Sequence, residues 1–236
     1  MLSIAPNLLT TQRLILRPWR ETDRAGFARL NDDPAVMEFM PRRLPRDESD
    51  ATAARIQAVI EERGWGFWAV EVKGGEGGGE HAAGEGVVAG AAEGGDAAHP
   101  AGEGASAHPA NAAGEGAAAH AGAFIGFVGL SVPSFTSHFT PCVEIGWRLM
   151  KEHWGNGYAS EAAAACLRFG FENLKLQEIV AFTVPLNKRS IGVMEKIGMS
   201  RAPADDFDHP KLSAGHPLQR HVLYRINRSD WLNRHG

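Results

Sequence analysis

Cysteine is scarce in this sequence, which has only Cys142 and Cys166 among its 236 residues. Two cysteines support no disulfide framework, and this pair lacks the spacing of a metal-binding motif. Long apolar runs are missing too, because no stretch reaches the roughly 18 residues needed to cross a membrane. The first 13 residues contain no long apolar run of the secretory type. These absences favour a cytoplasmic protein with no membrane partner.

A large excess of positive or negative charge is also lacking. The chain is 44% hydrophobic and 22% charged, with a net charge of −4, which is typical of a globular protein. Residues 74–122 contain 15 Gly, 17 Ala, seven acids and four His but no Lys or Arg. When these 49 residues and their seven acids are left out, the net charge of the other 187 residues rises from −4 to +3. A chain this close to neutral is not a strongly electrostatic nucleic-acid binder.

The segment at about 74–122 holds only two large aliphatic residues, Val87 and Val88. It cannot bury enough apolar area to offset the entropy lost on ordering, so we expect a disordered low-complexity insert. The stretches at 66–73 and 123–132 look like strands, so the insert interrupts the turn of a hairpin. Its four histidines are a conceivable metal site. Scattered solvent-exposed histidines are the simpler interpretation, and we predict no metal.

Hydrophobic periodicity predicts a single domain over residues 1–236, interrupted by the insert. Strand-like patterns occur at 11–17, 66–73, 123–132, 141–150, 177–184 and 221–226. Helical spacing occurs at 22–31, 47–63, 158–173 and 187–197. Several strands precede one strand, loop, helix and strand unit. This order predicts an α/β (α+β) fold in which a mixed sheet is flanked by helices.

The segment from Glu152 to Glu161 (EHWGNGYASE) is the clearest chemical signal. Gly155 and Gly157 are separated by one residue and lie between an expected strand and an expected helix. The backbone N–H groups of such a turn, together with the helix dipole, favour a phosphate or pyrophosphate. A tight turn that needs glycine only for its backbone angles is the structural alternative.

Three phosphate-binding interpretations compete for this loop. A P-loop requires Lys followed by Ser or Thr after its glycines, and Tyr158 and Ala159 stand there instead. A dinucleotide fold requires an acid at the end of the next strand, whereas Glu178 begins that strand. The strand before the loop also alternates polar with apolar residues, unlike a central parallel strand buried on both faces. A coenzyme A pyrophosphate site is the interpretation that fits best.

Four segments, in order, resemble the GNAT superfamily of acyl-CoA N-acyltransferases, specifically the RimJ/RimL-type protein N-terminal acetyltransferases. They are TTQRLILRPWRETD at 10–23, NDDPAVMEFM at 31–40, VEIGWRLMKEHWGNGYASEA at 143–162 and NKRSIGVMEKIGM at 187–199. The resemblance implies a GNAT-like, mostly antiparallel, splayed sheet. It also implies transfer of an acetyl group from acetyl-CoA, as cosubstrate, to an amine. The family usually has Gln or Arg where this chain has Glu152, a departure that affects one side-chain contact but not the cradle of amides.

The resemblance also implies the residues that contact acetyl-CoA. It predicts a bulge near Gly146 that opens a slot for the pantetheine arm, with the amides of Leu149 and Met150 facing the thioester carbonyl. A simple packing glycine is the alternative role for Gly146. The predicted cosubstrate contacts are Leu149, Met150, Trp154, Gly155, Asn156, Gly157, Tyr158, Ala159, Asn187 and Ser190.

Glu144 is the candidate general base, because acyl transfer to an amine requires a deprotonated nucleophile. We expect it on the strand face away from the core, where its carboxylate would accept a proton from the incoming ammonium through water. A carboxylate is a weak base for a lysine with a pKa of about 10.4, but an N-terminal amine titrates at about 7.7–8.0. Glu144 therefore favours α-amines as acceptors. A salt bridge to Arg148 is its alternative role.

Asn187 and Ser190 open the last predicted helix, where Asn is a good N-cap. In the resembling family this pair also contacts the coenzyme near its sulfur, which makes Ser190 a candidate to help protonate the leaving thiolate. Many GNAT enzymes have a tyrosine acid where this chain has Met194. Solvent is therefore the other proton source.

Acceptor contacts are predicted on both rims of the site. Phe39 and Met40 follow the DPAV turn and would wall the amine pocket, while the segment 205–221 would overhang it. His209 in that segment is a candidate substrate contact. A polar lid is the alternative, and the aspartates and histidines of the segment lack a recognised metal spacing.

The sequence thus predicts a single-domain N-acetyltransferase, a monomer or homodimer, in which an amine attacks acetyl-CoA directly in a ternary complex. The acceptor is a primary amine, for which a protein N-terminal α-amine is one candidate. A small-molecule amine acetyltransferase and a non-catalytic CoA-binding module are the rival functions. Release of free CoA thiol only with the right amine separates an enzyme from a sensor.

Overall fold

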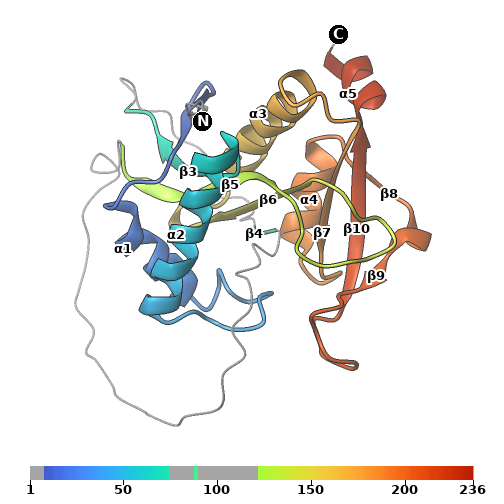
Figure 1. Cartoon of the computed structure of the whole chain (residues 1–236), viewed down its shortest axis with the longest axis horizontal. Coiled ribbons are helices and arrows are strands. Elements are labelled where there is room, and N and C mark those ends of the chain that lie inside the picture. Colours follow the sequence, from blue (N-terminus) through green and yellow to red (C-terminus); the bar gives the residue numbers. More distant parts are fainter. Residues whose placement is uncertain (1–7, 75–87, 90–121, 236) are drawn as a thin grey trace.

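The computed structural model describes residues 8–74, 88–89 and 122–235, which build one sheet with helices on both of its faces (Figure 1). The helices are α1 (Asp23–Asp32), α2 (Arg46–Arg63), α3 (Tyr158–Glu172), α4 (Lys188–Lys196) and α5 (Arg228–His235). The strands are β1 (Leu9–Thr10), β2 (Leu14–Arg17), β3 (Phe67–Val72), β4 (Val88–Ala89), β5 (Phe124–Ser131), β6 (Glu144–Leu149), β7 (Glu178–Thr183), β8 (Ser200–Arg201), β9 (Phe207–Asp208) and β10 (Arg220–Asn227).

The main path across the sheet is β1-β2-β3-β5-β6-β7-β10-β8. Among the strand pairs in the described residues, only β6 and β7 run parallel. This confirms the predicted mixed, mostly antiparallel sheet flanked by helices. β3 and β5 pair antiparallel, with Phe67 opposite Gly129, as expected for the two arms of a hairpin.

Alternation along β5 assigns the helices to opposite faces of the sheet. Phe127 packs against Phe27 of α1, with ring centroids 5.8 Å apart. Leu130 lies three residues further along the strand, so it points to the other face, where it approaches Gly170 of α3. We call these two sides the α1 face and the α3 face. Helix α2 packs beside α1, and α4 packs beside α3.

Strand β6 is fully paired on one side only. It pairs with β5 in an unbroken register from Glu144 to Leu149, but its register with β7 contains one pair, Glu144 opposite Val180. The two parallel strands therefore diverge beyond Glu144 and leave the end of β6 open toward β7. The predicted bulge at Gly146 is wrong, because the register between β5 and β6 shows no shift there.

The open end of β6 is partnered by the two-residue strand β4. Val88 pairs with Arg148, and Ala89 pairs with Trp147. These two residues are the part of 75–121 that the structure describes. The prediction of disorder for the rest of this insert lies outside the described residues.

Several features differ from the predicted elements, among them the short strands β1, β4, β8 and β9, which were not predicted. The strand expected at 11–17 begins at Leu14, because Thr11 turns the chain by donating its N–H to Leu14 O, 3.0 Å away. Helix α5 was not predicted, since its sequence RSDWLNRH is mostly polar. Trp231 anchors it against Phe171, with ring centroids 5.4 Å apart. No helix in the described residues is both long and apolar enough to cross a membrane.

Candidate active site

The glycine loop joins β6 to the N-terminus of α3 at the open end of the sheet. Gly155 and Gly157 both adopt left-handed backbone angles, with φ of 80° and 75°, which favour glycine. Gly157 is the N-cap of α3, and no side chain caps the first turn of this helix. The N–H groups at the start of α3 therefore have no side-chain acceptor, as an anion-binding turn requires.

Two cationic side chains converge on Gly157. A Cβ atom built on this glycine would lie 3.6 Å from Arg13 Nη2 and 3.9 Å from Lys196 Nζ. Arg13 comes from the segment before β2, and Lys196 is the last residue of α4. The loop therefore presents two cations as well as backbone amides to one small region.

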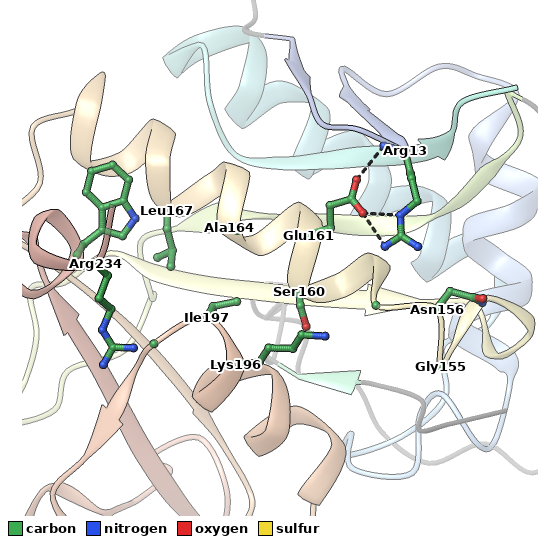
Figure 2. Close-up of a pocket in the computed structure, with 13 residues that line it drawn as sticks. Arg13, Gly155, Asn156, Ser160, Glu161, Ala164, Leu167, Lys196, Ile197 and Arg234 are labelled. Carbon is green, nitrogen blue, oxygen red and sulfur yellow. Dashed lines mark hydrogen bonds and ion pairs between the residues drawn. The ribbon is translucent and has the colours of Figure 1, made fainter. Parts of the chain in front are cut away.

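Glu161, one turn into α3, holds Arg13 in this position (Figure 2). Its carboxylate accepts from the Arg13 backbone N–H at 2.8 Å and from Arg13 Nε at 2.7 Å, and Thr11 Oγ1 donates to it at 2.5 Å. Burial acts in the opposite direction, but these hydrogen bonds and the guanidinium lower the pKa of Glu161 below its ordinary value. Glu161 is therefore a charged anchor that orients Arg13 toward the loop.

Sequence reasoning missed Arg13 and Lys196 as site residues. Both lie inside segments that resemble the GNAT superfamily, at 10–23 and 187–199. They are 183 positions apart in the sequence, so no local spacing reveals that they meet. Only the packing of α4 and the segment before β2 around the glycine loop brings them together.

Two cavities flank the glycine loop. The larger, about 580 Å³, runs from Arg13 and the loop along α3 to Trp231 and Arg234 of α5 (Figure 2). The smaller, about 210 Å³, lies between the loop and α4. Seven of the ten predicted cosubstrate residues line one or both cavities: Leu149, Trp154, Gly155, Asn156, Gly157, Tyr158 and Ala159. Met150, Asn187 and Ser190 are not among the lining residues of these two cavities.

The end of β6 offers one backbone amide toward the opening. Met150 N–H donates to Ile125 O at 2.9 Å, so it is not available for a thioester carbonyl. N–H groups alternate between the two edges of an antiparallel strand, so the Leu149 amide points to the edge that faces β7. Leu149 O in turn accepts from Trp154 Nε1 at 2.8 Å. Of the two backbone amides predicted to face the thioester carbonyl, Leu149 and Met150, only that of Leu149 points to this edge.

The start of α4 agrees with the predicted cap and adds an unpartnered hydroxyl. Asn187 Oδ1 accepts from the Ser190 N–H at 3.2 Å, and Asn187 Nδ2 donates to Thr183 Oγ1 at 3.0 Å. Ser190 is fully buried, and its Oγ has no hydrogen-bond partner. A buried hydroxyl without a partner costs free energy, so this atom is available to a ligand that reaches the start of α4.

Glu144 lies on the α1 face of β6 and is almost fully buried. The expectation that this face lies away from the core is wrong, because the residues of β6 are buried on both faces, Glu144 included. Ser131 Oγ donates to Glu144 Oε1 at 3.1 Å. Arg148 donates instead to Asn31 and Met40, so the alternative salt bridge between Glu144 and Arg148 is absent from the described contacts.

The two cysteines are unsuited to nucleophilic chemistry. Burial, aided by the carboxylate of Glu144, raises the pKa of the Cys142 thiol to about 12. Burial also raises the pKa of the Cys166 thiol well above its ordinary value. Because the thiolate is the nucleophile, neither cysteine is poised to carry an acyl group.

Comparison with known families decides the identity of this fold. The GNAT acetyltransferase domain family matches residues 13–200, which hold β6, the glycine loop and α4. The chain belongs to the GNAT acetyltransferase family. The match spans both sides of the opening between β6 and β7 as well as the segment that carries Arg13.

Individual relatives match shorter stretches. YkkB of Bacillus subtilis (strain 168) is 47% identical over 78 residues, which are 33% of this chain and 44% of that protein. The FsC-acetyl coenzyme A-N(2)-transacetylase of Aspergillus fumigatus is 32% identical over 117 residues, which are 47% of this chain and 48% of that protein. The chain thus spans about half the length of the curated relatives it matches.

Solved structures resemble the whole GNAT domain. A GNAT-family acetyltransferase from Bacillus anthracis has a TM-score of 0.62 at 19% identity, covering 94% of this chain and 99% of that one. A spermidine N-acetyltransferase from Vibrio cholerae, in complex with CoA and spermine, has a TM-score of 0.58 at 16% identity. It covers 94% of this chain and 100% of that one. At such identities these likenesses show the fold.

A loop between α1 and α2 approaches the opening of the GNAT domain from the α1 face. Glu38 Oε2 pairs with Arg189 Nη2 of α4 at 2.8 Å, and Met40 Sδ accepts from Arg148 Nη2 of β6 at 3.3 Å. The loop therefore links α4 with β6. Phe39 lies between these two contacts in the sequence, and its role with Met40 as a wall of the amine pocket stays a prediction.

His209 has a packing role on the same face. It is almost fully buried, and its ring centroid lies 4.7 Å from that of Phe135 and 5.0 Å from that of His221. Substrate contact by His209 stays a prediction. Among the described residues, no group of three or more His, Cys, Asp or Glu side chains is arranged to hold a metal ion.

Glu152, the position where this GNAT domain departs from the usual loop pattern, points away from the cradle. Its carboxylate lies 3.3 Å from Arg29 Nη2 of α1, and both side chains are exposed. Exposed ion pairs of this kind contribute little to stability. The departure therefore leaves the backbone amides of the glycine loop unaffected.

Proposed function

We propose that this protein is an N-acetyltransferase that transfers an acetyl group from acetyl-CoA to a primary amine by direct attack in a ternary complex. The observation that carries the proposal is the divergence of β6 from β7, which leads to an uncapped α3 N-terminus flanked by Arg13 and Lys196. This arrangement suits a long ligand with an anionic pyrophosphate at one end. Ser190 Oγ, which is buried and has no partner among the described residues, adds a hydroxyl at the start of α4.

Acetyl-CoA supplies an acetyl group that is already activated as a thioester. The residues of this chain bind and orient it. The amides after Gly157 and the cations of Arg13 and Lys196 would hold the pyrophosphate. The Leu149 amide would donate to the carbonyl oxygen, where negative charge develops during attack.

Glu144 would take the proton from the acceptor ammonium. Its burial on the α1 face places the carboxylate on the side approached by the loop that carries Phe39 and Met40. An α-amine needs little help from such a base, because its pKa of about 7.7–8.0 lies near neutral pH. Protonated cysteines support direct attack over a covalent acyl-cysteine route.

Ser190 would return a proton to the leaving thiolate. Its hydroxyl has a free donor, because its Oγ makes no hydrogen bond, and its backbone is fixed by the cap at Asn187. Met194 is buried and carries no acidic proton. Water is then the source that replenishes the Ser190 hydroxyl.

The acceptor we favour is a protein N-terminal α-amine, as in the RimJ/RimL-type enzymes that the motifs resemble, and the setting we favour is the cytoplasm. A small-molecule acceptor is supported by the names of two similar proteins, an FsC N(2)-transacetylase and a spermidine N-acetyltransferase. The loop between α1 and α2 and the segment 205–221 would select between these acceptors.

A screen of acceptors with thiol detection tests the proposal. Purified protein and acetyl-CoA would be incubated with amino acids, dipeptides, N-terminal peptides and polyamines, and free CoA thiol measured. We expect thiol release to depend on one class of primary amine and to be matched by acetylated product. Acetyl-CoA binding without thiol release in any mixture would identify a CoA-binding module instead.

A further inference from the structure

Arg148 is a buried cation that the proposed reaction does not use. Its side chain reaches across the α1 face from β6, and only 2% of the residue is exposed. Nη1 donates to Asn31 Oδ1 at 2.7 Å, and the guanidinium lies 5.4 Å from the centre of the Phe127 ring. Burial lowers the pKa of Arg148 to about 10, so the side chain still carries its positive charge at neutral pH.

The polar contacts of Arg148 do not balance this charge. Nη2 donates only to the thioether sulfur of Met40, at 3.3 Å, and sulfur is a weak acceptor. Nε is buried, and the part of the chain that the structure describes gives it no hydrogen-bond partner. No carboxylate pairs with Arg148 among the described residues. A buried guanidinium without an anion is costly.

A second buried arginine shows what a structural role looks like in this protein. Arg17 donates to both oxygens of Asp23, at 2.7 and 2.9 Å, and to Glu71 at 2.6 Å. Two carboxylates thus neutralise Arg17 within the core. Arg148 is equally buried but has only an amide, a thioether and an aromatic ring. The difference indicates that the anion for Arg148 comes from outside the described residues, and a bound ligand is one source of it.

Nη2 of Arg148 points to the loop between α1 and α2, which we expect to wall the acceptor pocket. Met40, which contacts Nη2, is only half-buried and belongs to the loop between α1 and α2. Methionine is flexible and readily repacks, so it can move aside for a stronger acceptor. Glu144 lies on the same face of β6, four residues earlier. Four strand residues span about 13 Å between Cα atoms.

We propose that Arg148 binds a carboxylate of the acceptor, so that the preferred acceptor carries an amine at one end and a carboxylate several bonds away. The proposal rests on the proposed function and names its substrate class. Arg148 Nη2 and Nε would donate to the carboxylate, which would replace the Met40 sulfur, while Glu144 receives the amine end. Guanidinium and carboxylate pair through two parallel hydrogen bonds, which a carboxamide cannot match. An amino acid, a dipeptide or a peptide with an acidic side chain has this chemistry.

A matched pair of acceptors tests the role of Arg148. We would measure kcat/KM for glycylglycine and for glycylglycinamide, which differ in the terminal carboxylate. The variants are Arg148→Met, which removes the charge, and Arg148→Lys, which keeps it. In the unaltered protein we expect the acid to be preferred by at least about tenfold, since a charge-assisted pair is lost with the amide. Arg148→Met should abolish that preference through KM, and Arg148→Lys should retain part of it.

Three controls separate a role of Arg148 in acceptor binding from a general effect of charge, from misfolding and from a lack of the proposed activity. Arg46→Gln removes an exposed positive charge on α2 and should leave the preference unchanged. Acetyl-CoA binding to Arg148→Met, measured by calorimetry, should match that of the unaltered protein and report a folded donor side. Absence of thiol release with every amine in the unaltered protein would count against the proposed function itself.

Three outcomes would overturn the role of Arg148. In the first, the unaltered protein uses the amide as well as the acid. In the second, Arg148→Met lowers kcat/KM for both acceptors equally, which points to packing alone. In the third, the variant loses activity only with succinyl-CoA as donor, which would place the carboxylate on the acyl chain rather than on the acceptor.

Discussion

The two sides of the opening in the sheet differ in the chemical groups that they offer to a ligand. The donor side, around Gly155 and Gly157, consists of backbone amides and half-exposed cations that surround two cavities. The acceptor side, on the α1 face, consists of polar side chains that are nearly fully buried, among them Glu144 and Arg148. A site made of backbone tolerates changes of neighbouring side chains but not an added Cβ. A site made of buried side chains depends on single functional groups.

The largest effect is expected from Glu144→Gln on the acceptor side. The amide keeps the shape and an oxygen that can accept from Ser131, but it is no longer a base. Turnover should fall by about 100-fold or more while acetyl-CoA affinity persists, because general base catalysis typically contributes this much. The loss should shrink at high pH, where the acceptor amine deprotonates without help. Steady-state kinetics from pH 6 to pH 9 would check both points.

A control and an alternative sharpen this test. Glu178→Gln makes the same chemical change at a half-exposed position that pairs with Arg225, and it should leave turnover intact. If Glu144 only orients the acceptor ammonium, its variant would show a raised KM with most of kcat retained. Unaltered kcat and KM at pH 7 would remove Glu144 from the mechanism and turn attention to His138 and the histidines of 205–221.

The next largest effect is expected from Gly157→Val on the donor side. Gly157 has a φ of 75°, and a Cβ there would approach the cationic groups of Arg13 and Lys196. The added side chain would both strain the loop and fill the cradle. Acetyl-CoA affinity should weaken by at least about tenfold, or roughly 1.4 kcal/mol, as measured by calorimetry.

A second glycine separates strain from loss of the cradle. Gly215 has a similar φ of 82°, and a Cβ there meets nothing within 4 Å. Gly215→Val therefore introduces comparable backbone strain outside the two cavities, and acetyl-CoA affinity should not change. Equal affinity in folded Gly157→Val and unaltered protein would count decisively against this phosphate site.

Much of the donor side could be predicted from sequence, because its parts are contiguous. The turn at Gly155 and Gly157 and the cap at Asn187 follow from short patterns, and the structure has both. The roles of Arg13 and Lys196 depend on packing between distant segments, which no short pattern encodes. Their contacts were therefore invisible until the fold was known.

On the proposed acceptor side, the sequence predicted the strand correctly but its burial wrongly. Alternation of Glu144, Gly146 and Arg148 with apolar residues predicts a strand with one face outside the core. Strand β6 is buried on both faces instead, Glu144 included. Periodicity reports which residues share a face, but it cannot report whether another layer covers that face. His209 is buried as well, and its predicted substrate contact stays a prediction.

A smaller effect is expected from Glu161→Gln, which loosens Arg13 on the donor side. The Glu161 carboxylate has a lowered pKa when folded, so its contribution to stability is complete above the ordinary carboxyl pKa of about 4.3 and disappears as pH falls through the folded value. Urea unfolding should show the unaltered protein more stable than the variant at pH 7, with the difference vanishing in acid. A difference that persisted in acid would mean that the carboxylate charge is not responsible.

The same substitution should weaken acetyl-CoA binding only a few-fold. Arg13 is 41% exposed at its side chain, and exposed charge pairs are screened by salt. We expect Arg13→Gln to lower the affinity slightly more than Glu161→Gln, and both losses to diminish at high ionic strength. A Glu161→Gln loss larger than that of Arg13→Gln would show that Glu161 has a role beyond holding Arg13.

The smallest effect is expected from deletion of residues 76–120 with β3 and β5 rejoined by a short turn. Closure entropy grows slowly with loop length, and β3 and β5 already pair along their lengths, so the free energy of unfolding should change by less than about 2 kcal/mol. Turnover should be retained.

The deletion also removes Val88 and Ala89 from the edge of β6, so acetyl-CoA should bind at least as tightly as before. Replacing 76–120 by a Gly/Ser linker of equal length should give the same affinity as the deletion, since both free this edge. Weaker binding in the deleted protein would assign the segment a part in holding acetyl-CoA, and the donor side would then extend beyond the glycine loop.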